Sequence, residues 1–124
     1  MAIREKHNGD TTVLVPDASI TWRTQPELKD ALDGLSDSGQ TLVVIDLSHV
    51  GEVSAYGLGM LASRCVRFRR SYGDIRLANT PAAVVALLRA ARLEDFFEQF
   101  DSVERAVRSF TVMDSGGEKK EEEV

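Results

Sequence analysis

The spacing of hydrophobic and polar positions alternates along the chain between the period of a strand and the period of a helix. Asn8-Gly9-Asp10 separates two short alternating stretches, which is a strong signal for a β-hairpin. The stretch from Leu42 to Leu47 is apolar except for Asp46, which predicts a central strand covered on both faces. The strand-like stretches are residues 3–7, 12–16, 42–47 and 75–79, with a short fifth candidate within residues 93–100.

Four further stretches repeat apolar residues at i, i+3, i+4 and i+7, which predicts amphipathic helices. Two of them begin with a capping box, Thr24 with Glu27 and Asp101 with Glu104. A third follows Thr80-Pro81, a cap with proline at the first helical position, and the remaining helix is expected at about residues 55–72. The order of elements predicts an α/β fold, with about four helices packed on a mixed sheet of about four to five strands.

Length and composition narrow the class of protein. The 124 residues suffice for one core, so we expect a single domain at residues 1–112 and a mobile acidic tail at residues 113–124. The net charge of −5 argues against a nucleic-acid binder. No apolar run approaches the roughly 20 residues that span a bilayer, and the first residues do not resemble a signal peptide. We therefore expect no membrane span and a cytoplasmic location.

The residues that commonly carry chemistry form no catalytic or metal-binding pattern. His7 and His49 are not spaced as metal ligands, and Cys65 is the single cysteine, expected to pack in the core. The glycines near residue 57 lack the spacing of a phosphate-binding loop. Asp46 has no nucleophile or base arranged around it, so we expect it to support the following turn by hydrogen bonding. The sequence predicts no enzyme, no metal and no cofactor.

Arginines recur on the helix predicted at residues 55–72. Arg64, Arg67 and Arg70 follow one another every three residues, and Arg69 lies beside them. They form either a patch that steers an acidic partner or an ordinary solvated helix face, of which the second is the simpler interpretation.

Two segments resemble a known family. Residues 46–61, DLSHVGEVSAYGLGML, and residues 92–107, RLEDFFEQFDSVERAV, are similar to the two signature segments of STAS domains, in particular of bacterial anti-sigma factor antagonists. With the order of elements, the resemblance covers about residues 1–112. It implies a single STAS-like domain that binds proteins and does not catalyse a reaction.

In that family a serine directly after an aspartate is phosphorylated by a partner kinase that is also the anti-sigma factor, and phosphate blocks binding. The resemblance places the aspartate at Ser54 and the phosphoacceptor at Ala55, which has no hydroxyl. Ser54 is a possible substitute acceptor, but the simpler interpretation is that it is the N-cap of the helix. His49 and Glu52 also depart from the family pattern, which bears on the choice of partner.

The resemblance thus implies a module that binds an anti-sigma factor or serine kinase-like protein, or another signalling protein, in transcriptional regulation. The alternative is a STAS subunit of a lipid or ABC-type transport complex or of a signalling scaffold. A homodimer through an exposed edge of the first strand is also open. The predicted partner-binding residues are Glu52, Ser54, Ala55, Tyr56, Gly57, Leu58, Leu61 and Arg64.

Overall fold

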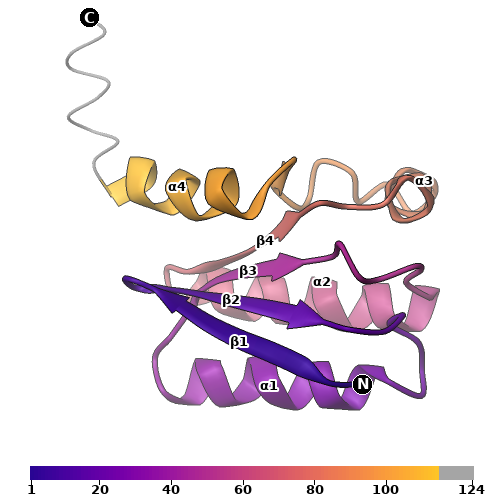
Figure 1. Ribbon diagram of the computed structural model, residues 1–124, viewed down its shortest axis with the longest axis horizontal. Helices are drawn as coiled ribbons and strands as arrows, with labels where there is room; N and C mark the ends of the chain where they lie inside the picture. The colour runs from indigo at the N-terminus through magenta and orange to yellow at the C-terminus, as the bar shows by residue number, and fades with distance from the viewer. Residues whose placement is uncertain (115–124) are drawn as a thin grey trace, which may run out of the picture.

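A mixed five-stranded sheet in the order β1-β2-β3-β4-β5 forms the centre of the molecule (Figure 1). The computed structural model describes residues 1–114, with side chains through residue 111. β1 pairs antiparallel with β2, and the remaining neighbours are parallel. The predicted fold class is confirmed. The strands are β1 (Ile3–Asn8), β2 (Thr11–Pro16), β3 (Leu42–Asp46), β4 (Asp74–Ala78) and β5 (Gln99–Phe100).

The predicted hairpin joins β1 to β2 through Gly9 and Asp10. Gly9 has a φ of +62°, and Asp10 does not share this left-handed conformation. A positive φ at the first residue alone is typical of a type II′ turn, whose twist matches that of the flanking strands. β1 is the first strand in the sheet order and so lies at an edge, as expected. Its exposed Arg4, Glu5 and Lys6 are side chains that discourage further strand pairing.

Helices cover the two faces of the sheet unequally. α1 (Gln25–Asp37) and α2 (Ala55–Arg70) lie side by side on one face, and α4 (Val103–Asp114) lies on the other, while α3 (Ala82–Ala90) lies near one end (Figure 1). The face under α1 and α2 holds the larger core, which includes Phe68 and Leu61. The α4 face holds a smaller cluster of Val13, Val15, Val44, Ala78, Ala106, Val107 and Phe110.

The predicted helix caps are wrong in detail. The hydroxyl of Thr24 donates to the carbonyl of Ser19 at 2.6 Å and caps nothing, because the preceding loop folds back against it. Pro81, rather than Thr80, occupies the N-cap of α3 without a side-chain bond. α4 begins later than expected, and the Oγ of Ser102 accepts the N–H of Arg105 at 3.1 Å. The predicted tail lies outside the described residues except for residues 113 and 114, which belong to α4.

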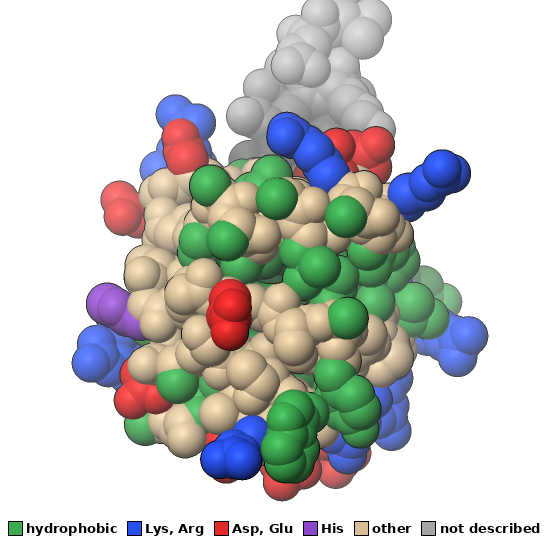
Figure 2. All heavy atoms as spheres, turned by 90° about the vertical axis from the view of Figure 1, so that its right-hand side faces the viewer, with side chains coloured by type: hydrophobic (Ala, Val, Ile, Leu, Met, Phe, Trp, Pro, Cys, Tyr) green, Lys and Arg blue, Asp and Glu red, His purple; other side chains and the backbone are tan. Residues whose placement is uncertain are grey.

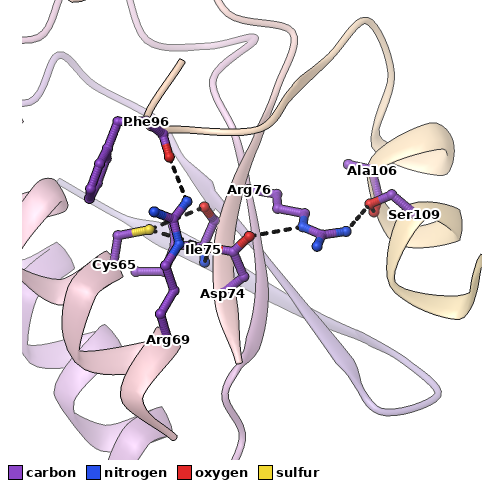
Figure 3. Close-up of polar contacts among 8 residues, drawn as sticks. All are labelled: Cys65, Arg69, Asp74, Ile75, Arg76, Phe96, Ala106 and Ser109. Atoms are coloured by element: carbon purple, nitrogen blue, oxygen red, sulfur yellow. Dashed lines mark hydrogen bonds and ion pairs between the residues drawn. The ribbon is translucent and has the colours of Figure 1, made fainter. Parts of the chain in front are cut away.

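A buried polar cluster ties α2 and α4 to β4 (Figure 3). The carboxylate of Asp74 accepts from Arg69 Nε at 2.8 Å and from Arg76 Nε at 3.1 Å. Arg76 also donates to Ser109 Oγ at 2.6 Å, and its guanidinium lies 4.1 Å from the centre of the Phe110 ring. A buried cation needs such partners, so this cluster is the polar complement of the small core under α4.

Cys65 is buried beside the same cluster, as predicted, and its thiol donates to Asp74 Oδ1 at 3.4 Å. Burial raises the pKa of the Cys65 thiol to about 11. A thiol that stays protonated at neutral pH is a poor nucleophile and metal ligand, so the structural interpretation of Cys65 holds.

Candidate functional site

The turn from β3 to α2 is held in place by Asp46, the last residue of β3. Its Oδ1 accepts the N–H of Ser48 and the side-chain amide of Asn79, each at 3.0 Å. Partial burial raises the pKa of Asp46, but these two donors offset it, and the pKa lies below its usual 3.8. Asp46 therefore stays ionised and supports the turn, as predicted from the sequence.

The loop that precedes α1 fastens the start of α2. Ile20 forms an isolated parallel bridge with Val53, donates its N–H to Glu52 and accepts the N–H of Ser54 at 2.8 Å. A Cβ on Gly57 would lie only 2.8 Å from the side chain and the carbonyl oxygen of Ile20. Gly57 thus allows the first turn of α2 to approach the backbone of this loop.

Ser54 is the N-cap of α2. Its Oγ accepts the N–H of Gly57 at 3.1 Å, and its carbonyl accepts the N–H of Leu58 at 2.8 Å. The N-cap interpretation is confirmed. The hydroxyl of Ser54 is half-buried and engaged with its own helix, whereas Ala55, one residue later, is exposed. Phosphorylation of Ser54 and the alignment of Ala55 with the phosphoacceptor remain predictions.

An exposed surface surrounds Ala55. Tyr56 is 64% exposed, and Trp22, two residues after the bridging Ile20, is 65% exposed. Trp22 lies on the loop that Ile20 bonds to the start of α2. Large exposed aromatic side chains are typical of protein contacts. We refer to this region as the α2 N-terminal surface, which consists of Trp22, Glu52, Ser54, Ala55 and Tyr56.

Charged side chains gather around the edge of this end of the molecule. Figure 2 shows a centre that is mostly apolar or neutral, apart from an acidic side chain, and charged side chains of both signs at the periphery. A neutral centre with a charged rim is the usual composition of a protein interface.

Four of the predicted partner-binding residues do not lie on this surface. Leu58 and Leu61 are in the core, 4% and 1% exposed, because they face the sheet. Gly57 is buried against Ile20. Arg64 is half-buried and pairs with Asp33 of α1. These residues support the surface from beneath or beside it and are not part of it.

Trp22 is the residue that sequence reasoning missed. It lies in an irregular loop that no periodic pattern describes, and the backbone contacts of Ile20 with Glu52, Val53 and Ser54 fasten that loop to the start of α2. The signal available in the sequence was a lone tryptophan in a polar segment, followed by Arg23. In the structure the guanidinium of Arg23 lies 5.2 Å from the centre of the Trp22 ring.

The arginines of α2 do not form one free patch. Arg64 and Arg67 both reach Asp33, at 2.8 and 3.3 Å, while Arg69 points to Asp74. Burial raises the pKa of Asp33, but Arg64 and Lys29 offset this effect, and the pKa lies below its usual 3.8. Three of these arginines therefore form ion pairs that hold α1, α2 and β4 together.

Three further features of the described part of the chain concern metal ions, cavities and membranes. No group of three or more His, Cys, Asp or Glu residues could hold a metal ion there. A cavity of about 420 Å³ lies at the hairpin end of the sheet, lined in part by His7, Gln40 and Tyr72. Among residues 1–114, no helix has the length and apolar character needed to cross a membrane.

Comparison with known proteins agrees with this geometry. The family model of the STAS domain matches residues 2–106. The chain belongs to the STAS family. STAS domains are typically non-catalytic regulatory modules, which agrees with the features around Ala55. No curated protein sequence matches the chain.

Solved structures share the STAS fold at low sequence identity. A candidate anti-sigma factor antagonist from Thermotoga maritima is 18% identical, with a TM-score of 0.81 over 86% of this chain and 92% of that one. The unphosphorylated Bacillus anti-sigma factor antagonist SpoIIAA is 13% identical, with a TM-score of 0.76 over 89% and 96%. A sulfate transporter family protein from Wolinella succinogenes is 12% identical, with a TM-score of 0.73 over 85% and 88%.

Proposed function

We propose that this STAS domain is a non-catalytic docking module of the anti-sigma factor antagonist type, which binds an anti-sigma factor or serine kinase-like protein through the α2 N-terminal surface. Two exposed aromatic side chains carry the proposal: Tyr56, directly after Ala55, and Trp22, on the loop that Ile20 bonds to the start of α2. Buried aromatic side chains supply much of the binding energy at protein interfaces, and these two are available for burial.

Ala55 removes the family's control of binding. A phosphate on a serine at this position would add negative charge to a surface on which Glu52 is already acidic. Alanine cannot carry it, and the hydroxyl of the preceding residue, Ser54, accepts the N–H of Gly57. Binding is therefore constitutive or controlled outside this turn.

The test combines capture of the partner with a phosphorylation assay. The tagged full chain, expressed in its native cell, should recover an anti-sigma factor with a kinase-type ATPase domain, identified by mass spectrometry. Ala55→Glu should abolish recovery by placing a charge in the interface, whereas Tyr72→Ala, at the opposite end of α2, should not. Incubated with that kinase and ATP, Ala55→Ser should gain one phosphate and the native chain none. Phosphate on Ser54 of the native chain would refute the loss of the switch.

A second function is supported by one observation. The sulfate transporter family protein has the same fold, and a structural subunit of a transport complex needs no phosphoacceptor, which fits Ala55. Recovery of a transporter ATPase in place of a kinase would establish this alternative and exclude the first.

A further inference from the structure

A groove between α1 and α2 continues from the α2 N-terminal surface. It has a volume of about 260 Å³ and shares Tyr56 with that surface. The two helices that form it run side by side on one face of the sheet (Figure 1). The groove is lined by Gln25, Lys29, Tyr56, Met60 and Arg64.

Gln25, one of the residues that line this groove, carries an unsatisfied acceptor. The residue is only 8% exposed, and its Oε1 is buried without a hydrogen-bond partner among the described residues. Buried polar atoms are almost always paired, so the side-chain amide of Gln25 favours a donor that it can reach by turning toward the groove. A backbone N–H is the most common such donor.

The charge around the groove is positive. Lys29, Arg64 and Arg67 surround the single carboxylate of Asp33, whose distances to them range from 2.8 to 3.4 Å. The lowered pKa of Asp33 keeps it ionised, so three cations face one anion. Glu27, a nearby acid on α1, is paired with the N-terminal amine. The excess positive charge complements an anion.

The groove also has an apolar part. Met60 is buried at its base, and the exposed ring of Tyr56 forms one side. Methionine adapts to the shape of an apolar side chain placed against it. One occupant therefore needs a donor, an apolar group and a negative charge close together.

We propose that the groove binds an extended acidic peptide segment of the partner protein. A backbone N–H of the segment donates to Gln25 Oε1, an apolar side chain packs on Met60 and Tyr56, and a carboxylate lies near Lys29 and Arg64. The proposal rests on the docking function and adds to it a second contact that does not depend on residue 55. Such a contact gives the partner a means of recognition that phosphorylation at the turn would not control.

Peptide titration of the full chain tests the groove directly. Three short peptides with blocked ends share a leucine and differ only at the positions next to it. Those positions carry glutamate in the first peptide, glutamine in the second and lysine in the third. In ¹⁵N NMR spectra, the glutamate peptide should shift the signals of Lys29, Tyr56 and the Gln25 side-chain amide, more weakly as salt is raised. Equal shifts with all three peptides, shifts elsewhere, or no binding by the glutamate peptide would overturn the proposal.

Variants then separate the contributions. Gln25→Met keeps the length of the side chain without the acceptor and should weaken the glutamate peptide about three- to tenfold, as expected for one hydrogen bond. Lys29→Gln should weaken it about threefold, as expected for an exposed ion pair. Lys6→Gln, on the edge strand, is the matched control and should bind as the native chain does. Unchanged affinity in both groove variants would contradict the assigned contacts.

The captured partner distinguishes failure of the groove from failure of the proposed function. Loss of the complex with Ala55→Glu, and its full retention in Gln25→Met and Lys29→Gln, would overturn the groove and leave the docking function intact. Weakening by the groove variants as well supports both. A complex that survives Ala55→Glu would overturn docking at the α2 N-terminal surface itself.

Discussion

Both ends of α2 are held by a close approach to another segment, but only the first end has the residue types that helix termini usually prefer. At each end a glycine lies so close to another segment that no Cβ fits: Gly57 against Ile20, and Gly73 against Thr41. The first end follows local preference, with a serine N-cap at Ser54. The second end departs from it, because Tyr72 adopts a φ of +62°, where glycine is usual.

The departure has a tertiary cause. The N–H groups of Tyr72 and Gly73 bond to the carbonyls of Arg69 and Phe68, which is the Schellman pattern. In that pattern the left-handed position is normally glycine, as Gly39 is after α1. After α2 the glycine comes one residue later, where the chain must pass Thr41. After α2, the approach between segments rather than the helix terminus determines which position needs a glycine.

The largest effect is expected at the second end. A Cβ on Gly73 would lie 2.0 Å from the carbonyl oxygen of Thr41, a backbone atom that cannot move aside. Gly73→Ala should lower the free energy of unfolding by about 3 kcal/mol or more, as severe overpacking does. Urea denaturation followed by circular dichroism measures it. Gly59→Ala, on the exposed face of α2 with nothing within 4 Å, is the control and should be neutral or stabilising. If Gly73→Ala has the same urea midpoint as the native chain, the close approach to Thr41 does not hold this end of α2 in place.

A smaller loss is expected at the first end. Gly57→Ala places a Cβ 2.8 Å from Ile20, but an alanine in the first turn of α2 gains some helix propensity. The net loss should be about 1–2 kcal/mol in the same urea experiment. A loss equal to that of Gly73→Ala would mean that the two ends are equally rigid, and the comparison would fail.

The N-cap is next in size. Ser54→Ala removes the acceptor for the N–H of Gly57 and should cost about 1 kcal/mol. Ser54→Asp, which keeps an acceptor, should recover most of that stability. Thermal unfolding of the three proteins measures both changes. If Ser54→Ala unfolds at the same temperature as the native chain, the hydroxyl is not needed as a cap. The argument against phosphorylation of Ser54 is then weaker.

The left-handed tyrosine should respond in the opposite direction. Tyr72→Gly relieves a strained φ and should raise the free energy of unfolding by about 0.5–1 kcal/mol, after the entropy of glycine is subtracted. Gly39→Ala is the matched reversal after α1, with open space around the new Cβ, and should destabilise. Destabilisation by Tyr72→Gly would reveal a contact of the ring that matters in the folded protein.

The smallest effect concerns Asp46, before the first end. Its folded pKa lies below 3.8, so its contribution to stability is present above that pH and is lost as pH falls through the folded pKa. Asp46→Asn should therefore flatten the acid side of a stability–pH curve measured by urea denaturation. The pKa of Asp33 is also lowered, so Asp33 should cause part of the loss of stability at acid pH in both the native chain and the variant. An unchanged curve would exclude Asp46 as an acid-sensitive support of the turn.

The sequence predicted the elements because their information is local. The Asn8-Gly9 turn, the apolar stretch at β3 and the periodic faces of the helices are each encoded within a few neighbouring residues. The errors at Thr24 and Thr80 arose because the loop contact with Ser19 and the exact helix start depend on packing.

The candidate site was predicted less completely for the same reason. Ser54 as N-cap follows from local preference, and the similarity to STAS domains indicated the turn. Trp22 reaches the site only through Ile20, and Arg64 is engaged by Asp33, 31 residues away in the chain. Leu58 and Leu61 belong to the apolar stripe of α2, so their burial was already implied by the helical period that identified them.

The strand order also affects how the chain is made. Each strand pairs with the strand before it, so a strand that leaves the ribosome finds its neighbour already present. Nothing has to be inserted between earlier strands, but the valines beneath α4 stay uncovered until that last helix emerges. An unfinished or truncated chain therefore displays an apolar sheet face that chaperones and proteases recognise. The arrival of α4 covers this face.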